Sequence, residues 1–277
     1  MYKIDAHQHF WKFDPQEYAW IDQSMKTLRR DFLPPNLQSV IAGAGVSGTV
    51  AVQARQTLEE TRWLLQLAEQ YELIRGVVGW VPLLRANVGE ILADLSANIK
   101  LRGVRHVLHD EADPFYMLLE DFQRGVRELK RYGLAYDILI FERHLPQTIR
   151  FVDRHPEQVF IVDHLAKPRV KARELSPWRE NIRELGRRLN VYCKVSGLIT
   201  EADHRTWKPE DLKPYLETVL EAFGPKRLLF GSDWPVCLLA GQYKQWVSIV
   251  EGTVSQLSPA EQEWVWSCTA QLAYRLS

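Results

Sequence analysis

Two histidines two residues apart lie near the start of the chain, in the stretch DAHQHFW at residues 5–11. If this stretch is a β-strand, His7 and His9 share one face, because successive side chains of a strand point to opposite faces. Two imidazoles placed in this way can chelate one metal ion, or they can donate two hydrogen bonds to a single carbonyl oxygen. The alternative for either histidine is a hydrogen-bonded residue of the core.

Other polar residues with catalytic potential also stand at or near the ends of short apolar segments. They include His164 in FIVDHLA and Asp233 in GSDWP. Further polar side chains in this kind of position are Gln53, Arg105, His106, Asp137 and Lys194. The carboxyl-terminal ends of parallel barrel strands carry the active site in essentially every barrel enzyme. The pattern therefore predicts one catalytic site built from several strands.

The elements that position these residues form a regular alternation. Segments rich in Val, Ile, Leu and aromatic residues occur at 2–10, 46–54, 73–83, 101–108, 134–141, 159–166, 191–198 and 227–236. Between them, helical spacing occurs at 58–71, 88–96, 120–133, 145–156, 178–190 and 211–224. Near-continuous apolar segments are typical of parallel strands buried on both faces. The alternation predicts an α/β fold, a (β/α)8 TIM barrel. A doubly wound open sheet is the alternative, but no glycine-rich phosphate turn follows the first strand.

Two parts of the chain lie outside this alternation. Residues 11–45 form an insertion after the first strand, and we expect it to lie as a lid over the carboxyl-terminal mouth of the barrel. Extra helices are predicted at the end of the chain, around 243–257 and 259–275. SPAE at 258–261 supplies an N-cap serine, a proline in the first turn and an early glutamate. Because no linker or low-complexity tract interrupts the pattern, residues 1–277 are expected to form one domain.

The composition excludes several classes of protein. The net charge is +0, so no basic field is expected to recruit nucleic acid or an anionic membrane. No apolar segment approaches the roughly 20 residues that span a bilayer, and the N-terminus lacks a signal-peptide pattern, so we expect a cytoplasmic protein. The expected partner is a small-molecule substrate. A homo-oligomer is left open, because the terminal helices carry Trp246, Trp264 and Trp266.

Several motifs together resemble the amidohydrolase superfamily, in its amidohydrolase-2 branch. They are HQHFW, DFLPP, GTVAVQA, GVRHVL, VDHLAKP, KVSGL and GSDWPV, and they extend over essentially the whole chain. Their combination resembles the sugar lactonases that act on L-fucono- and L-rhamnonolactone, with the 2-pyrone-4,6-dicarboxylate hydrolases as relatives. The resemblance implies a barrel enzyme that opens an aldonolactone through attack of water on the lactone carbonyl.

The resemblance also implies roles for individual residues. His7 and His9 match the first-strand pair of the family, and His164 matches the histidine that ends the sixth strand. Asp233 matches the last-strand aspartate that activates the hydrolytic water. Because ester hydrolysis needs a base and a stabiliser for the carbonyl oxygen, we expect Asp233 to be the general base. The three histidines would then polarise the carbonyl, directly or through a metal.

The expected metal content is one ion at most. Many metal-dependent members of the superfamily carry a further histidine on the seventh strand and a bridging lysine or carboxylate midway round the barrel. Here the seventh strand has no histidine and the fifth has Asp137 rather than a lysine, so a two-metal centre is not expected. His7, His9, His164 and Asp233 could still hold one Zn²⁺ or another divalent metal. The resemblance implies that members of the lactonase group are able to work without bound metal, so zinc that binds without being required is one expected outcome.

Further residues are expected near the substrate. They are Gln53, Arg105, His106, Lys194, Asp137, Trp11, Trp20 and Trp234. The polar members could donate hydrogen bonds to the hydroxyls or carboxylate of a sugar acid, but Arg105 and Lys194 could instead form a buried ion pair with Asp137. The tryptophans could stack on an apolar sugar face or merely pack the lid. Asp163 is expected to face away from His164 and to buttress its strand, because neighbouring residues alternate.

Other functions compete with the lactonase. A decarboxylase of the same superfamily needs a tightly held metal, and the missing histidine on the seventh strand argues against it. An amidase must expel a poorer leaving group than a lactone does. A degenerate barrel that only binds a sugar acid is the non-enzymatic alternative. Loss of Asp233 or of the histidine pair would favour it, but all of these residues are present.

Overall fold

Parallel strands in sequence order form the centre of the molecule. The computed structural model describes residues 2–276, and within them eight strands form a single sheet. The strands are β1 (Lys3–Gln8), β2 (Val46–Val52), β3 (Ile74–Gly79), β4 (Leu101–Val107), β5 (Ala135–Leu139), β6 (Phe160–Val162), β7 (Val191–Val195) and β8 (Leu228–Phe230). All the strand predictions are confirmed, although β6 and β8 are shorter than their apolar segments.

The sheet closes into a barrel through the residues that follow β8. The amide of Asp233 donates a hydrogen bond to the carbonyl of His7 over 2.8 Å, and the amide of His9 donates to the carbonyl of Trp234 over 2.7 Å. The first strand and the end of the eighth are therefore hydrogen-bonded neighbours. This closure confirms the (β/α)8 barrel, and the open doubly wound alternative is wrong.

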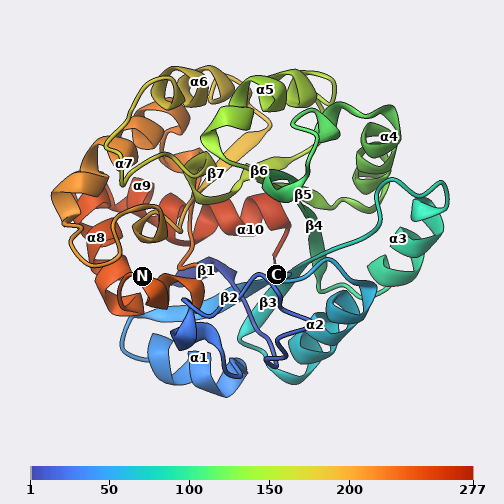
Figure 1. Ribbon diagram of the computed structural model, residues 1–277, viewed down its shortest axis with the longest axis horizontal. Helices are drawn as coiled ribbons and strands as arrows, with labels where there is room; N and C mark the ends of the chain where they lie inside the picture. Colours follow the sequence, from blue (N-terminus) through green and yellow to red (C-terminus); the bar gives the residue numbers. More distant parts are fainter. Residues whose placement is uncertain (1, 277) are drawn as a thin grey trace.

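Helices surround the strands on the outside, as Figure 1 shows. They are α2 (Leu58–Gln70), α3 (Val88–Ser96), α4 (Glu120–Leu129), α5 (Leu145–Asp153), α6 (Trp178–Leu185), α7 (Pro209–Phe223) and α8 (Tyr243–Val254). Each of these helices lies within a segment predicted to be helical from its amphipathic spacing. The spacing is visible in the sequence because the apolar side of each helix packs on the outward side chains of the strands. No helix within residues 2–276 is long and apolar enough to cross a membrane.

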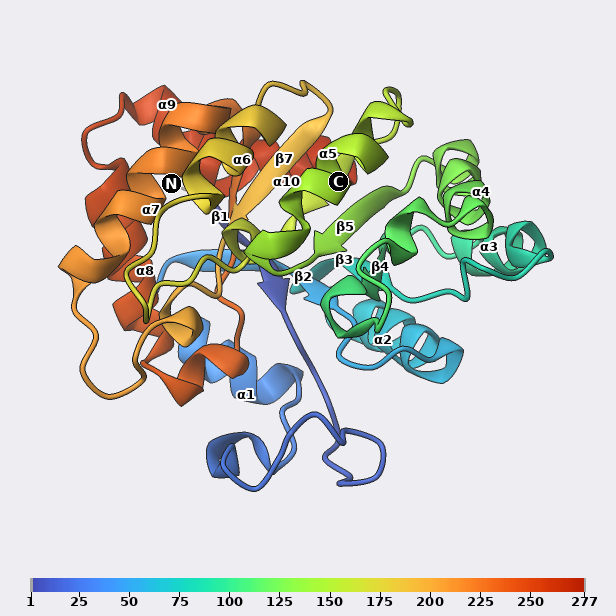
Figure 2. The same ribbon diagram turned by 45° about the horizontal axis from the view of Figure 1, so that its top comes forward.

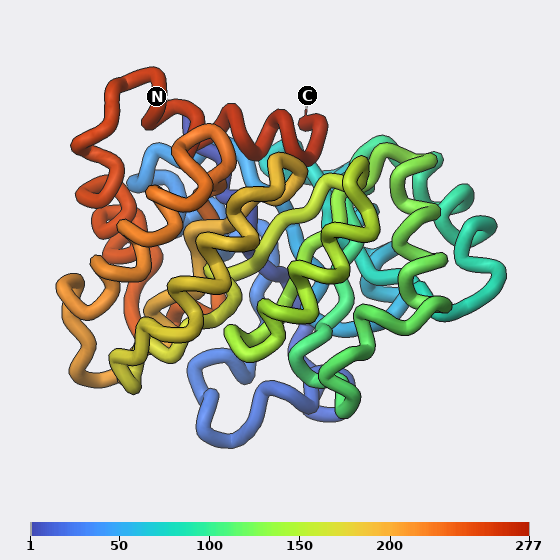
Figure 3. The backbone as a smooth tube through the Cα atoms, turned by 90° about the horizontal axis from the view of Figure 1, so that it is seen from above, coloured from blue at the N-terminus to red at the C-terminus, as the bar shows by residue number. Residues whose placement is uncertain are grey.

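The last helical segment closes the amino-terminal end of the barrel. It consists of α9 (Pro259–Glu263), a π-helical stretch (Trp264–Cys268) and α10 (Thr269–Tyr274). The predicted N-cap is confirmed, because the Ser258 hydroxyl accepts a hydrogen bond from the amide of Glu261. Tyr274 and alanines of α10 pack with inward side chains of the strands in an apolar cluster. Figure 3 shows α10 at one end of the molecule and the first part of the insertion, residues 11–33, at the other.

The insertion after β1 forms the predicted lid. Figure 2 shows it projecting beyond the end of the barrel, and its chain returns through α1 (Pro34–Ile41). Trp11 is fully buried inside it, and the indole N–H donates to the carbonyl of Arg30 over 2.9 Å. Trp11 also pairs with Phe32 through two backbone hydrogen bonds, which fix the base of the lid.

Candidate active site

The four residues matched to the family motif meet at the carboxyl-terminal end of the barrel. His7 Nε2 lies 3.1 Å from His9 Nε2. The Oδ1 atom of Asp233 lies 3.4 Å from Nε2 of His9 and 3.8 Å from Nε2 of both His7 and His164. All four side chains are buried. The residues come from the ends of the first, sixth and eighth strands and form one cluster, as the sequence pattern predicts.

A local change in strand geometry turns His7, in β1, and His9, just after it, inward. Ile4 and Ala6 already belong to the inward-facing apolar cluster, so strict alternation would turn His7 outward. The register of β1 against β2 shifts between Asp5 and Gln8, as at a β-bulge. After this shift His7 and His9 both face the barrel interior.

The backbone after β6 turns His164 into the same space. Residues 164–167 all have left-handed φ angles between 47° and 59°, and so does Asp233 with φ 57°. Non-glycine residues rarely adopt this conformation, and such strain is concentrated at functional sites. Gly197, after β7, makes room for the histidine. A Cβ atom on Gly197 would lie 2.4 Å from Nδ1 of His164.

A buried charge network lies directly beneath the cluster. Lys194 is fully buried and forms ion pairs with Asp137 and, over 2.9 Å, with Asp163. Arg105 donates to the other oxygen of Asp163 over 3.0 Å. The hydroxyl of Tyr274 donates to Asp137 over 2.7 Å. The ion pair of Lys194 with Asp137, which the sequence left open, is present.

The prediction that Asp163 faces away from His164 is wrong. Asp163 faces the barrel interior, where Oδ1 lies 3.3 Å from Nδ1 of His7. Alternation does not apply here, because β6 ends at Val162 and the left-handed backbone begins at His164. Asp163 and His164 therefore both point inward.

Burial and neighbouring groups set the charges of the cluster. Burial lowers the pKa of His164 to about 4 and the pKa of His7 well below its usual value. Burial acts to raise the pKa of Asp233, but neighbouring His164 and a hydrogen bond with His9 outweigh it, so the pKa is lowered. At neutral pH the arrangement places an ionised carboxylate of Asp233 beside the neutral imidazoles of His7 and His164. Such a carboxylate can accept a proton from water.

A cavity of about 370 Å³ opens onto this cluster. His9, His164, Asp233 and Arg105 form part of its lining, and His7 is fully buried and does not line it. The lid contributes Trp20 and Met25 to the wall. The volume is within the range of small-molecule sites.

The predicted substrate contacts divide into two groups. Arg105 and Trp20 line the cavity, and their contact with substrate stays a prediction. The remaining residues lie outside its lining and are Gln53, His106, Lys194, Asp137, Trp11 and Trp234. His106 Nε2 lies 2.6 Å from Glu111, and Trp234 is buried against Phe32.

Several polar residues of the cavity were missed by sequence reasoning. They are His109, Asp110, Lys167, Thr200, Glu201 and His204. Lys167 pairs with Glu201 over 2.7 Å, which places a cation and a carboxylate together at the cavity wall. All of these residues lie after strand ends, and apart from Lys167, which belongs to VDHLAKP, neither periodicity nor a motif distinguishes them from ordinary loop residues. Lys167, three residues after His164, is the one that its position could have suggested.

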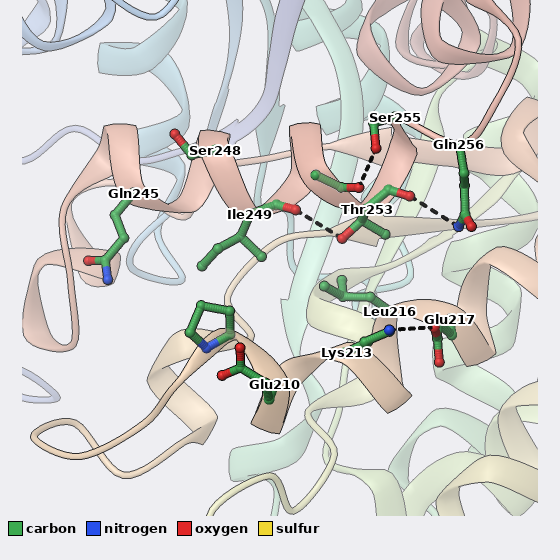
Figure 4. Close-up of a pocket in the computed structure, with 12 residues that line it drawn as sticks. Glu210, Lys213, Leu216, Glu217, Gln245, Ser248, Ile249, Thr253, Ser255 and Gln256 are labelled. Atoms are coloured by element: carbon green, nitrogen blue, oxygen red, sulfur yellow. Dashed lines mark hydrogen bonds and ion pairs between the residues drawn. The ribbon is translucent and has the colours of Figure 1, made fainter.

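A larger hollow of about 790 Å³ lies elsewhere, between α7 and α8. Figure 4 shows its walls, with Glu210, Lys213 and Glu217 from α7 and Ile249 and Thr253 from α8. Lys213 and Glu217 face each other over 3.8 Å along one helix. None of the residues proposed for chemistry lines this hollow, so its size does not make it the candidate site.

The cluster of His7, His9, His164 and Asp233 also has the composition of a metal site. Ligand atoms of His7, His164 and Asp233 all lie within 4.8 Å of one another. Imidazole nitrogens and a carboxylate oxygen are ligands that Zn²⁺ accepts. His9 supports the fit, because its Nδ1 lies 2.8 Å from the carbonyl oxygen of Val52, an outer contact that directs Nε2 toward the cluster.

Comparison with known proteins identifies the family. The family model described as amidohydrolase matches residues 4–276. The chain belongs to this family. An L-fucono-1,5-lactonase of Burkholderia multivorans is 42% identical over 285 residues, 99% of this chain and 96% of that protein. An L-fucono-1,5-lactonase of Burkholderia ambifaria is 38% identical over 244 residues, 87% of this chain and 83% of that protein.

Solved structures agree with this membership. A crystal structure of an amidohydrolase from Burkholderia multivorans with bound zinc has a TM-score of 0.96 and 42% identity to this amidohydrolase, and each chain is covered completely. A putative 2-pyrone-4,6-dicarboxylic acid hydrolase from Pseudomonas putida has a TM-score of 0.78 at 21% identity, covering 99% of this chain and 97% of the other. The second likeness shows the shared fold.

Proposed function

We propose that this amidohydrolase is a lactonase that hydrolyses a sugar aldonolactone, with L-fucono-1,5-lactone as the first candidate. The observation that carries the proposal is the buried carboxylate of Asp233 among three histidines at a small-molecule cavity. Relatives named L-fucono-1,5-lactonase, at 42% and 38% identity, support the choice of lactone. Polar residues around the cavity supply donors and acceptors suited to sugar hydroxyls.

In the proposed reaction Asp233 is the general base. Its carboxylate accepts a proton from water while the water oxygen attacks the lactone carbonyl. Arg105 and His164 line the same cavity and would stabilise the negative charge that develops on the carbonyl oxygen. When the ring C–O bond breaks, the proton on Asp233 passes to the departing ring oxygen, and the product is the open aldonic acid.

A metal would add to this chemistry without replacing these residues. His7, His9, His164 and Asp233 would hold one divalent ion, which when bound would polarise the carbonyl and acidify water. The decarboxylase and amidase alternatives are not favoured, because the two Burkholderia proteins that are 42% and 38% identical are named L-fucono-1,5-lactonase. Solved decarboxylase structures of the same fold are only 13% identical to this chain, so this likeness shows a shared fold and nothing about the reaction.

The test is a hydrolysis screen that follows acid release with a pH indicator. Aldonolactones of different stereochemistry and ring size are offered to the protein before and after chelator treatment, with an enzyme-free blank for spontaneous opening. We expect L-fucono-1,5-lactone to be among the fastest substrates. Acid release no faster than the blank for every lactone would overturn the proposal. Comparing the two preparations also decides whether metal is required.

A further inference from the structure

The lysine and arginine side chains that line the cavity are each paired with a carboxylate. In the described part of the chain these side chains are Arg105 and Lys167. Nζ of Lys167 lies 2.7 Å from Oε1 of Glu201. Nη1 of Arg105 lies 3.0 Å from Oδ2 of Asp163, and Nη2 donates to the carbonyl of Gln53. A negatively charged ligand would therefore meet cations that already have a carboxylate partner.

Carboxylates outnumber these cations on the cavity wall. Asp110, Glu201 and Asp233 all line the cavity. Asp110 lies 2.7 Å from the ring of His109, and it has no ion pair with a lysine or arginine of residues 2–276. Since the excess of carboxylates lowers the electrostatic potential of the cavity, the wall is suited to an uncharged ligand better than to an anion.

The pair of Lys167 with Glu201 is built into two neighbouring loops. Lys167 is the last of the left-handed residues after β6, and Glu201 ends the short helical turn after β7 (Ile199–Glu201). The Lys167 side chain is 19% exposed and the Glu201 side chain 18% exposed. Separation of two charges that are largely removed from water is costly, so Lys167 stays committed to Glu201 when a ligand enters.

We propose that Glu201 is a specificity-determining residue that neutralises Lys167 and thereby makes the cavity reject lactones that carry a carboxylate. The proposal rests on the proposed lactonase function and names the charge of its substrate. A neutral lactone can accept a hydrogen bond from Lys167 and donate a hydroxyl hydrogen to Glu201 without separating the pair. A carboxylated lactone would give up its hydration, find no free cation and face Glu201.

The same charge arrangement acts on the product. Hydrolysis converts a neutral lactone into an aldonate anion, so a negative charge is created inside the cavity. Juxtaposed like charges repel each other, and the carboxylates of the wall then favour departure of the product. Glu201 therefore disfavours every anion in the cavity, whether it arrives as a substrate or is formed there.

A purely structural role of the pair is the alternative. Lys167 and Glu201 could serve only to fasten the loops after β6 and β7. These loops are already joined through their backbones, because the amide of Lys171 donates to the carbonyl of Glu201 over 3.0 Å. A fastening role predicts lower stability when the pair is removed, but no change in the preference between neutral and charged ligands.

The first test uses the wild-type protein and two lactones that differ at C6. L-galactono-1,4-lactone carries a neutral hydroxymethyl group there, and galactaro-1,4-lactone carries a carboxylate. Acid release is followed with a pH indicator against an enzyme-free blank for each lactone. We expect kcat/KM to be at least about 10-fold higher for the neutral lactone, the scale of one hydrogen bond to a charged group. Equal values would overturn the proposal.

The second test replaces Glu201 by Gln, which keeps the shape of the side chain and leaves the charge of Lys167 without compensation. We expect kcat/KM for galactaro-1,4-lactone, relative to the neutral lactone, to rise about 10-fold or more. Because the gain depends on Lys167, it should disappear in the double variant Lys167→Met/Glu201→Gln. An unchanged preference in folded Glu201→Gln, or a gain that persists in the double variant, would contradict the proposal.

Glu174→Gln is the matched control. Glu174 pairs with Arg169 over 2.6 Å at the surface, and neither residue lines the cavity. The substitution makes the same change in the net charge of the protein, so it should leave the preference between the two lactones unchanged. If Glu201→Gln does not fold, the comparison of the two lactones in wild type decides.

Binding of the galactarate dianion, measured by calorimetry, separates this inference from the proposed function because it needs no catalysis. We expect Glu201→Gln to bind galactarate about 10-fold or more tightly than wild type, and the double variant to bind it as weakly as wild type. Absence of hydrolysis for every lactone would refute the lactonase, and the binding series would then decide the inference. Equal galactarate affinity of wild type and Glu201→Gln would overturn it.

Discussion

A buried tyrosine ties the lid to the barrel, and its removal should loosen the lid in a pH-dependent way. The hydroxyl of Tyr18, in the lid, donates to the carboxylate of Glu60 at the start of α2 over 3.2 Å. The same carboxylate accepts the amides of Ala54 and Arg55, over 2.9 and 2.8 Å. Glu60 is almost fully buried. Tyr18→Phe deletes one of these three donors and keeps the ring.

The size of the effect follows from the charge of Glu60. Burial raises its pKa from 4.5 to about 7, so the carboxyl is largely neutral at pH 5 and ionised at pH 8. A raised carboxyl pKa means that stability falls as the pH rises from about 4.5 to about 7. Hydrogen bonds to an ionised group are worth about 1.5–3 kcal/mol and those between neutral groups about 0.5–1.5 kcal/mol. Tyr18→Phe should therefore cost about 2 kcal/mol at pH 8 and about 1 kcal/mol at pH 5.

The assay is urea unfolding of wild type and Tyr18→Phe at both pH values. Tyr71→Phe is the control, because the Tyr71 side chain is partly buried and its hydroxyl has no hydrogen bond to another residue of the described chain. The reasoning would be refuted if Tyr18→Phe lowered the free energy of unfolding by the same amount as Tyr71→Phe. It would also be refuted if the decrease for Tyr18→Phe were larger at pH 5 than at pH 8. Because Trp11 packs against both Tyr18 and Trp20, and Trp20 lines the cavity, KM for the lactone should also rise.

Further predictions concern the site itself. Gly197→Ala should sharply lower kcat and destabilise the fold by about 1 kcal/mol or more, because φ is +61° and the added Cβ collides with His164; a normal rate would contradict this. Gly252→Ala, within α8 and with open space around it, should stabilise the protein by about 0.5–1 kcal/mol in the same unfolding assay, and a loss would be unexpected. Trp20→Ala should raise KM with little change in unfolding free energy, because the side chain is 38% exposed at the cavity; an unchanged KM would remove Trp20 from the substrate contacts.

The barrel could be predicted from the sequence because strands buried on both faces appear as nearly continuous apolar segments. Strands such as β5 and β7 are apolar almost throughout, and the helices between strands show the complementary periodicity. The central cluster could be predicted for a related reason. Its members are polar residues at the ends of apolar segments, namely His7, His9, His164 and Asp233. Packing of the barrel does not require polar side chains at these positions, whereas an active site does.

The orientation of Asp163 and the outer part of the cavity could not be predicted. Alternation in a strand assumes extended backbone, and the left-handed residues that begin at His164 break that assumption. No local pattern predicts the pairing of Lys167 with Glu201, because these residues lie 34 positions apart and meet only where the loops after β6 and β7 are neighbours. Lys194 likewise lies 3.1 Å from His7 only because the barrel closes, although the two residues are 187 positions apart.

The measurement that tests the central claim most directly is kcat/KM for L-fucono-1,5-lactone in wild type and Asp233→Asn, side by side. The amide keeps the shape of the carboxylate but cannot accept a proton from water. Asp110→Asn is the control, because it changes a carboxylate of the same cavity outside the histidine cluster. We predict a loss of about 10²–10⁴-fold for Asp233→Asn, the scale of general base catalysis, and a far smaller loss for the control. Hydrolysis by Asp233→Asn at a rate close to that of wild type would contradict the account.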